Sequence, residues 1–150
     1  MKKVYLAALL VLFTATQTMA ADGVINVQSA FNVQETANRL ENILNEKGMT
    51  IFKRVSHSGG AANVGIDMKP TELIIFGNPK VGSPLMKCQK SVAIDLPQKA
   101  LIWEDSDSQA WISYNDPRYL EQRHQISGCE QALSKIEKAL SAITKAAATQ

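Results

Sequence analysis

The sequence predicts an α+β domain of two layers, in which a mostly antiparallel sheet carries helices packed on one of its faces. Residues 24–29 alternate apolar with polar side chains, which is typical of a half-buried strand. Residues 73–76 form a short apolar run without alternation, which indicates a strand that is central in the sheet or covered on both faces. Apolar residues recur every three or four positions between 133 and 143, as on the buried side of a helix. Read in order, the elements follow a β-α-β4-α arrangement.

The composition is that of an ordinary globular chain. Of the 150 residues, 45% are hydrophobic and 20% are charged, and the formal net charge is +2. Without Lys2 and Lys3, fourteen basic residues balance fourteen acidic ones. This neutrality gives no charge argument for nucleic acid or for an anionic membrane as a partner, and the length predicts one domain.

The first twenty residues have the pattern of a cleavable signal peptide. Lys2 and Lys3 precede an apolar run over residues 4–13, and small and polar residues follow. That run is too short to span a bilayer, which needs about 20 residues. Cleavage after Ala20 leaves a mature domain of residues 21–150 with no membrane span, exported and, in a Gram-negative bacterium, periplasmic. An uncleaved anchor or a buried first helix is the alternative.

Export changes how the two cysteines are interpreted. Cys88 and Cys129 are the only pair in the chain, and an oxidising compartment favours a disulfide between them. In the loop-entropy treatment such a bridge stabilises the fold by roughly 4 kcal/mol. A thiol-redox function for the pair is the alternative, weakened because the chain has no C-x-x-C motif.

The elements of the first half follow from local signals. A strand is predicted at 24–29, and Asn32 and Glu35 form a capping box for a helix that ends at Gly48. A second strand is predicted at 50–55. The sequence SHSGG at 56–60 predicts a loop.

The second half contains three more strands. The strand at 73–76 stops at Gly77-Asn78-Pro79, and Ser83 followed by Pro84 predicts a helix over residues 84–91. Residues 100–104 and 109–114 predict a hairpin around a polar turn, and Asp116-Pro117 opens another helical piece. The last helix should fray over residues 146–150.

Several short motifs of the sequence resemble those of the family known as domain of unknown function 302. They are GNP at 77–79, DLP at 95–97 and YNDP at 114–117, supported by Ser56-His57 and GIDMKPTEL at 65–73. The resemblance implies a β-α-β4-α fold similar to one half of a TATA-binding-protein-like architecture, and it implies no reaction. One departure is Ser56, where the family usually has an acidic residue before the histidine, and this weakens any acid–histidine pair there.

The candidate ligand-binding residues lie at predicted strand ends. We expect His57, Asn78, Tyr114 and Asp116 to meet at one rim above an apolar floor. The alternative is that the GNP and YNDP motifs only form sharp turns where the chain leaves the sheet, because Asn and Asp before proline form turns and helix caps. The neighbouring Trp103 and Trp111 supply either an aromatic wall or core.

No metal site or nucleophile motif stands out. The candidate metal ligands His57, His124, Met68 and Met86 lack the usual ligand spacing, and His124 is expected to be solvated. Gly77 to Ser83 has the glycine spacing of a phosphate loop without its lysine. The acidic residues Glu104, Asp105 and Asp107 are interpreted as a solvated turn, and no cofactor can be named.

These observations favour an exported ligand-binding or accessory module without catalysis, taking a small molecule or a protein partner. An acid–base enzyme using His57 with Tyr114 or Asp116 is the first alternative, and the thiol-redox protein is the second. A sheet with one uncovered face also predicts a homodimer.

Overall fold

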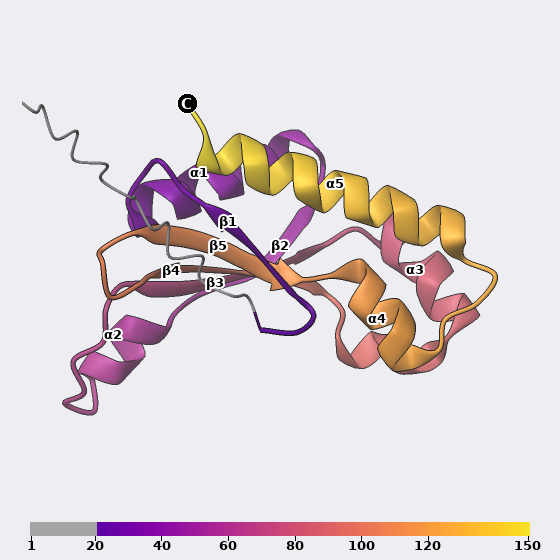
Figure 1. Ribbon diagram of the computed structural model, residues 1–150, viewed down its shortest axis with the longest axis horizontal. Coiled ribbons are helices and arrows are strands. Elements are labelled where there is room, and N and C mark those ends of the chain that lie inside the picture. The colour runs from indigo at the N-terminus through magenta and orange to yellow at the C-terminus, as the bar shows by residue number, and fades with distance from the viewer. Residues whose placement is uncertain (1–20) are drawn as a thin grey trace, which may run out of the picture.

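The computed structural model describes residues 21–150, so the predicted signal peptide lies outside the described residues. Five strands form a single antiparallel sheet in the order β1-β5-β4-β3-β2. Two long helices, α1 and α5, lie over one face of it, as Figure 1 shows. The α+β fold class predicted from the sequence is thereby confirmed. The strands are β1 (Val24–Gln28), β2 (Thr50–Ser56), β3 (Thr71–Gly77), β4 (Gln98–Glu104) and β5 (Ala110–Asn115), and the long helices are α1 (Val33–Glu46) and α5 (Glu130–Ala148).

The core fills the space between the sheet and the two long helices. Helix α1 begins where the Asn32 side chain accepts a hydrogen bond from the Glu35 amide at 2.9 Å, as the capping pattern predicted. Alternate residues of the strands face the helices, and the register places Ile74, Ala100 and Tyr114 on one level. The apolar stripes of α1 and α5 bury against this level. The stripes are Val33, Ala37, Leu40 and Leu44 on α1, and Leu133, Ile136, Leu140 and Ile143 on α5.

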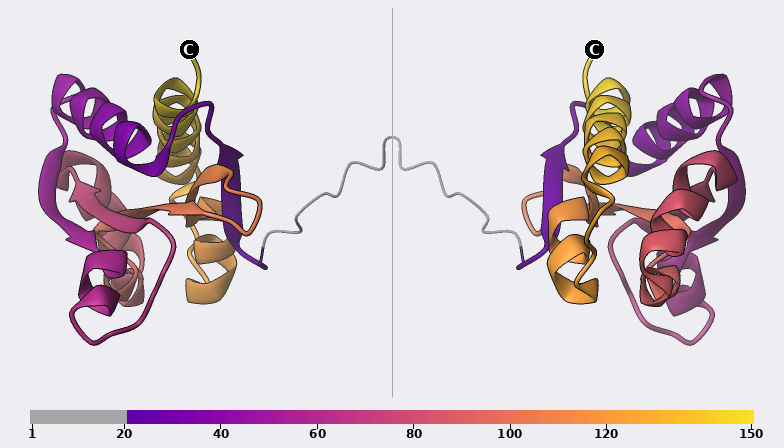
Figure 2. Two further views of the ribbon diagram at one scale, coloured as in Figure 1. Left: turned by 90° about the vertical axis from the view of Figure 1, so that its left-hand side faces the viewer. Right: turned by 90° about the vertical axis from the view of Figure 1, so that its right-hand side faces the viewer.

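Four shorter helical pieces lie around the ends of the sheet. Helix α2 (His57–Ala62) is at one end, and α3 (Pro79–Cys88) and α4 (Pro117–His124) are at the other, as Figure 2 also shows. The 3-10 turn η1 (Lys90–Ile94) packs against both α3 and α4.

Two of these pieces differ from the sequence expectation. The predicted loop at 56–60 contains the start of α2, because the Ser56 side chain accepts a hydrogen bond from the Gly59 amide at 3.0 Å. Helix α3 begins at Pro79, not at Pro84, because Asn78 caps it by accepting from the Lys80 amide at 2.9 Å. Two cap-then-proline signals therefore compete in this segment, and the first one starts the helix, with Pro84 inside it.

Helix α5 continues to Ala148, so the expected fraying is wrong for residues 146–148. Arg39 on α1 donates from Nε to the Ala147 carbonyl at 3.0 Å and from Nη2 to the Thr149 carbonyl at 2.6 Å. Ala148 is only 1% exposed. The arginine satisfies carbonyl groups that a helix end leaves without partners, and it joins the two long helices.

Cys88 and Cys129 lie at disulfide distance, as predicted, with their Cα atoms 6.4 Å apart. Cys88 is the last residue of α3 and Cys129 is the N-cap of α5. The pair therefore joins a peripheral helix to the main helical layer. Within residues 21–150, no helix is both long enough and apolar enough to cross a membrane.

Candidate functional site

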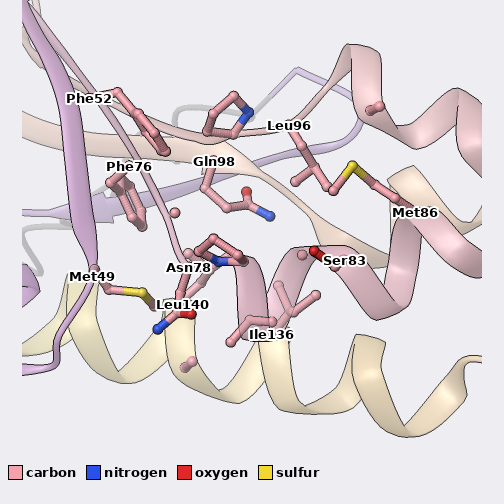
Figure 3. A pocket seen from close by; sticks show the side chains of 17 residues that line it. Met49, Phe52, Phe76, Asn78, Ser83, Met86, Leu96, Gln98, Ile136 and Leu140 are labelled. Atoms are coloured by element: carbon pink, nitrogen blue, oxygen red, sulfur yellow. The ribbon is translucent and has the colours of Figure 1, made fainter.

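An apolar pocket of about 390 Å³ lies at the end of the sheet where β3 stops and β4 begins, between α3 and α5. Figure 3 shows its lining side chains. Phe76 and Gln98 are register partners on β3 and β4, and both face the helical layer. Gly77 and Pro97 continue this wall: a Cβ on Gly77 would lie 3.5 Å from Pro97 Cβ, so the two strands meet closely at the pocket.

The helical walls of the pocket carry small and flexible apolar residues. Helix α5 contributes Ile136, Ala139 and Leu140, whereas α3 contributes Gly82 and Met86 among others. A Cβ on Gly82 would meet Leu96 Cδ1 at 3.8 Å, an ordinary contact, so a larger side chain there would extend into space that is now open. The pocket exists partly because this position has no side chain.

Phe52 lies at the mouth of the pocket and is 54% exposed. Strand β2 has an irregularity in its pairing with β3 between Ile51 and Lys53, so Phe52 has no register partner on β3. A β-bulge changes the direction of a side chain in this way, and here it places the Phe52 ring in the lining at the entrance of the pocket. A large aromatic ring that stays exposed beside an apolar cavity is available to cover a bound molecule.

Polar groups in the pocket are few, and no lining residue is ionisable. The Asn78 side chain is already engaged, since it accepts from the Lys80 amide and donates to the Gly48 carbonyl at 3.3 Å. Ser83 and Gln98 are the other two polar side chains. The chemistry of the pocket therefore suits an uncharged, mainly apolar molecule.

Of the predicted site residues, Asn78 lines this pocket, whereas Tyr114 and Asp116 do not. Asp116 is at the same end of the sheet, two strands away, and its side chain caps α4 by accepting from the Arg118 amide at 2.8 Å. Tyr114 is 5% exposed beneath the helical layer. Burial raises the pKa of Tyr114 above its ordinary 10.0, and a hydrogen bond with Thr144 opposes that shift.

His57 lies at the opposite end of the sheet, so the expected convergence of the four residues is wrong. The register places Tyr114 on β5 level with Arg54 on β2, and the three strand spacings between them amount to about 14 Å across the sheet. His57 lies three residues beyond Arg54, which adds about 10 Å along the strand direction and away from Asn78. The physical reason is strand direction: β2 runs antiparallel to β3 and β5, so its end meets their starts. The acid–base arrangement of His57 with Tyr114 or Asp116 is not formed in this fold.

His124 is buried rather than solvated, which corrects the sequence expectation. Its Nε2 lies 2.5 Å from Asp95 Oδ2 and its Nδ1 lies 3.0 Å from Ser91 Oγ. His124 is 8% exposed as a whole residue, and its ring connects the end of α4 to η1. Asp95, the first residue of the DLP motif, therefore holds in place the segment that continues into the pocket wall at Leu96.

The acidic turn between β4 and β5 is held by its own hydrogen bonds. Asp105 accepts from the Asp107 and Gln109 amides, both at 2.9 Å, and from Trp111 Nε1 at 2.7 Å. The Trp111 hydrogen bond is the largest cause that lowers the pKa of Asp105 below its ordinary 3.8. Among the described residues, no group of three or more His, Cys, Asp or Glu is arranged to hold a metal ion.

The sequence does not identify Phe52, Gly82 or Gln98 as site residues. Gln98 had a local signal, since it continues the alternation of Ala100 and Ile102 on the covered face, where an apolar residue is expected. Phe52 and Gly82 had none, because a bulge and a missing Cβ gain meaning only from their neighbours in space.

The fold defines a class of protein: a small α+β domain whose antiparallel sheet is covered on one face by two helices. The crystal structure of an uncharacterized conserved protein DUF302 from Bacillus stearothermophilus has this fold, with a TM-score of 0.76 and 21% identity, covering 85% of this chain and 99% of that one. The sequence pattern of the domain of unknown function DUF302 matches residues 25–143. The chain belongs to the DUF302 family.

The chain is also similar in sequence to longer curated proteins. The chain is 39% identical over 127 residues to "Fluoride-specific ion channel FluC 1" of Brucella suis biovar 1 (strain 1330), covering 84% of this chain and 50% of that protein. A protein of the same name from Brucella abortus biovar 1 (strain 9-941) is 39% identical over the same length, with 47% of it covered. The chain thus spans about half the length of these relatives.

Proposed function

We propose that this protein is a binding module that holds a small, uncharged and mainly apolar molecule without converting it. The observation that supports this most directly is the pocket of about 390 Å³, whose lining contains no ionisable residue. Small-molecule sites are typically cavities of about 300–1,000 Å³ with mostly apolar walls and a few polar groups. The pocket has both properties.

We further propose that the protein is exported and works in the periplasm. The pattern of residues 1–20 supports this, as does the cysteine pair at disulfide distance, because disulfides persist in oxidising compartments. Protein purified from the periplasm of its own source should begin at Ala21 and have an intact mass two hydrogens below that of the reduced chain. A mass that includes residues 1–20, or recovery only from the cytoplasm, would contradict export.

The binding proposal is tested by filling the pocket. Gly82→Leu should weaken binding of the fluorescent apolar probe N-phenyl-1-naphthylamine at least tenfold, because its side chain extends from α3 into the cavity. It should also stabilise the fold by about 0.5–1 kcal/mol, since leucine is a better helix former than glycine. Reduced binding therefore cannot be attributed to unfolding.

The matched control is Gly60→Ala on α2. A Cβ at Gly60 meets nothing within 4 Å, and the position is far from the pocket. This variant should bind the probe like the wild type. Equal binding by wild type and Gly82→Leu would mean that the probe binds elsewhere and that the pocket is not the site.

The curated relatives favour a second candidate, an accessory module of a fluoride channel. The observation is the 39% identity to about half of proteins named as fluoride-specific channels. On this proposal, deleting the gene should lower the growth of its source organism in fluoride, and the wild-type gene should restore it. Unchanged fluoride tolerance would contradict this candidate and leave the binding module unaffected.

The homodimer also stays a proposal. Its support is the sheet face opposite the helices, where Leu73, Leu101, Trp103 and Trp111 are only half-buried. Light scattering on the purified mature chain should give twice the monomer mass, and Leu101→Lys should return the chain to monomer. A monomeric wild type at high concentration would contradict it.

A further inference from the structure

Gln98 places a polar side chain where the core pattern calls for an apolar one. It is the first residue of β4 and pairs with Phe76, which is 1% exposed on the covered face of the sheet. The next residues on the same side of β4, Ala100 and Ile102, are both 0% exposed. The Gln98 carboxamide therefore enters the apolar layer where that layer borders the pocket.

Within residues 21–150, the carboxamide of Gln98 makes no side-chain hydrogen bond, and Figure 3 shows it pointing into the cavity between Phe76 and Leu96. A carboxamide has two N–H donors and a carbonyl acceptor. Asn78, the other carboxamide that lines the pocket, is engaged with Lys80 and Gly48. The Ser83 hydroxyl, on α3, likewise makes no side-chain hydrogen bond among the described residues. Gln98 is thus the free polar lining group with the most donors and acceptors, and the one that enters from the sheet.

The charge of the pocket limits what this group can recognise. No lining residue is ionisable, and the adjacent Lys99 is occupied, since its Nζ donates to the Asp95 and Pro97 carbonyls at 3.0 Å each. A charged ligand group would lose its hydration without gaining an opposite charge. A neutral group that both donates and accepts would satisfy the carboxamide at two points.

We infer that Gln98 is the specificity-determining residue of the pocket and that the ligand is a neutral amphiphile, with an apolar body and one carboxamide or alcohol group bound by Gln98. This inference rests on the proposed binding function. The apolar body lies against Phe76, Ile136 and Leu140, and Phe52 covers the entrance. The polar group is what sets this ligand apart from a plain hydrocarbon.

Three probes of similar length test the inference: octanamide, octanoate and n-octane, each followed by chemical-shift changes of the pocket amides. The wild type should bind octanamide at least tenfold more tightly than octanoate. Gln98→Met keeps the length of the side chain and removes its hydrogen-bonding groups, so it should lose at least tenfold in octanamide affinity while binding n-octane within twofold of the wild type.

The control is Gln28→Met on the edge strand β1, which makes the same chemical change at an exposed position away from the pocket. It should bind all three probes like the wild type. If octanamide and n-octane both bind and Gln98→Met binds octanamide unchanged, the role of Gln98 is wrong and the pocket stands. If no probe shifts the pocket amides of the wild type, the proposed function itself fails.

Discussion

At the scale of single residues, two side chains of the site depart from their usual surroundings. Phe52 is a large aromatic residue that stays 54% exposed, and Gln98 is an amide on the buried side of a strand. Each departure is unfavourable for a domain with an empty pocket, because apolar surface meets water in one case and a polar group sits among apolar ones in the other. The proposed amphiphile would cover the Phe52 ring and pair with the Gln98 carboxamide, so binding it would offset both departures.

Replacing Phe52 should separate binding from folding. Phe52→Ala removes a ring that is mostly in water, so the free energy of unfolding should change by less than about 1 kcal/mol, against about 3–5 kcal/mol for a buried phenylalanine. Affinity for N-phenyl-1-naphthylamine should fall roughly tenfold, because the ring covers the bound probe. Urea denaturation and fluorescence titration measure the two effects.

Val64→Ala is the control for that variant. Val64 is 72% exposed and follows α2 at the far end of the sheet, so the change should alter neither quantity. A Phe52→Ala variant that binds the probe normally would show that the ring is not part of the entrance.

Asp105 makes the stability of the hairpin depend on pH in acid. Its pKa in the folded state lies below the ordinary 3.8, so the carboxylate stabilises the fold fully above that value and loses this effect as the pH falls through the folded pKa. Asp105→Ala should therefore lower stability by a constant amount between about pH 5 and 8, and the difference from the wild type should shrink below about pH 4. Urea titration followed by tryptophan fluorescence measures this difference in stability, and a difference that grows in acid would contradict the assignment.

At the scale of elements, helix α3 is the wall of the pocket that depends most on its two ends. Its interior contains Gly82 and Pro84, which are poor helix formers, and Pro84 has no amide to donate within the helix. The Asn78 cap holds the start, and Cys88, paired with Cys129, holds the end against α5. The position of this wall thus follows from its ends more than from its own helical preference.

Removing the cysteine pair should loosen this wall. Cys88→Ser with Cys129→Ser opens a link between residues 41 positions apart, for which loop entropy predicts a loss of up to about 4 kcal/mol in the free energy of unfolding. The affinity for octanamide should also fall, because α3 is no longer fixed to α5. The double variant and the reduced wild type should give the same free energy of unfolding in urea denaturation and the same octanamide affinity in titration.

The same variant tests the thiol-redox alternative. A protein that works by thiol exchange loses its function in cells when both cysteines are serine, even where the variant is folded and binds the probe. If the folded double variant fully restores the phenotype of a strain that lacks the gene, the thiol-redox alternative is excluded.

Reduction of the wild type also tests the role of the cysteine pair in the pocket wall. An octanamide affinity that is unchanged by reduction would show that packing alone holds α3.

At the scale of the whole molecule, the sequence predicted the order and type of the main elements, because periodic apolar patterns are local. It did not predict the site, because strand order decides which strand ends meet. His57 was expected beside Asn78, and the antiparallel course of β2 puts it at the other end of the sheet. Burial of His124 depends likewise on Asp95, 29 residues away in the chain.

The pocket and the core share side chains, so binding and folding are coupled through the whole domain. Phe76 and Leu140 are at most 2% exposed and belong to the core between sheet and helices, and both also line the pocket. A molecule in the pocket therefore contacts the same layer that must separate when the chain unfolds. The unfolded chain has no such cavity, so the proposed ligand would bind the folded state selectively.

That coupling predicts the size of the effect of ligand on stability. Octanamide at one hundred times its dissociation constant should raise the free energy of unfolding by about 2.7 kcal/mol and the melting temperature by roughly 10 °C for a domain of this size. Gly82→Leu should melt higher than the wild type without ligand and gain at most about half as much free energy from it, because the leucine occupies part of the cavity and the tenfold weaker affinity leaves about 1.4 kcal/mol of stabilisation at the same concentration. Scanning calorimetry of both proteins with and without octanamide measures the four values. An equal rise in the two proteins would place the amphiphile outside the pocket, since only a ligand bound there competes with the leucine for the same space.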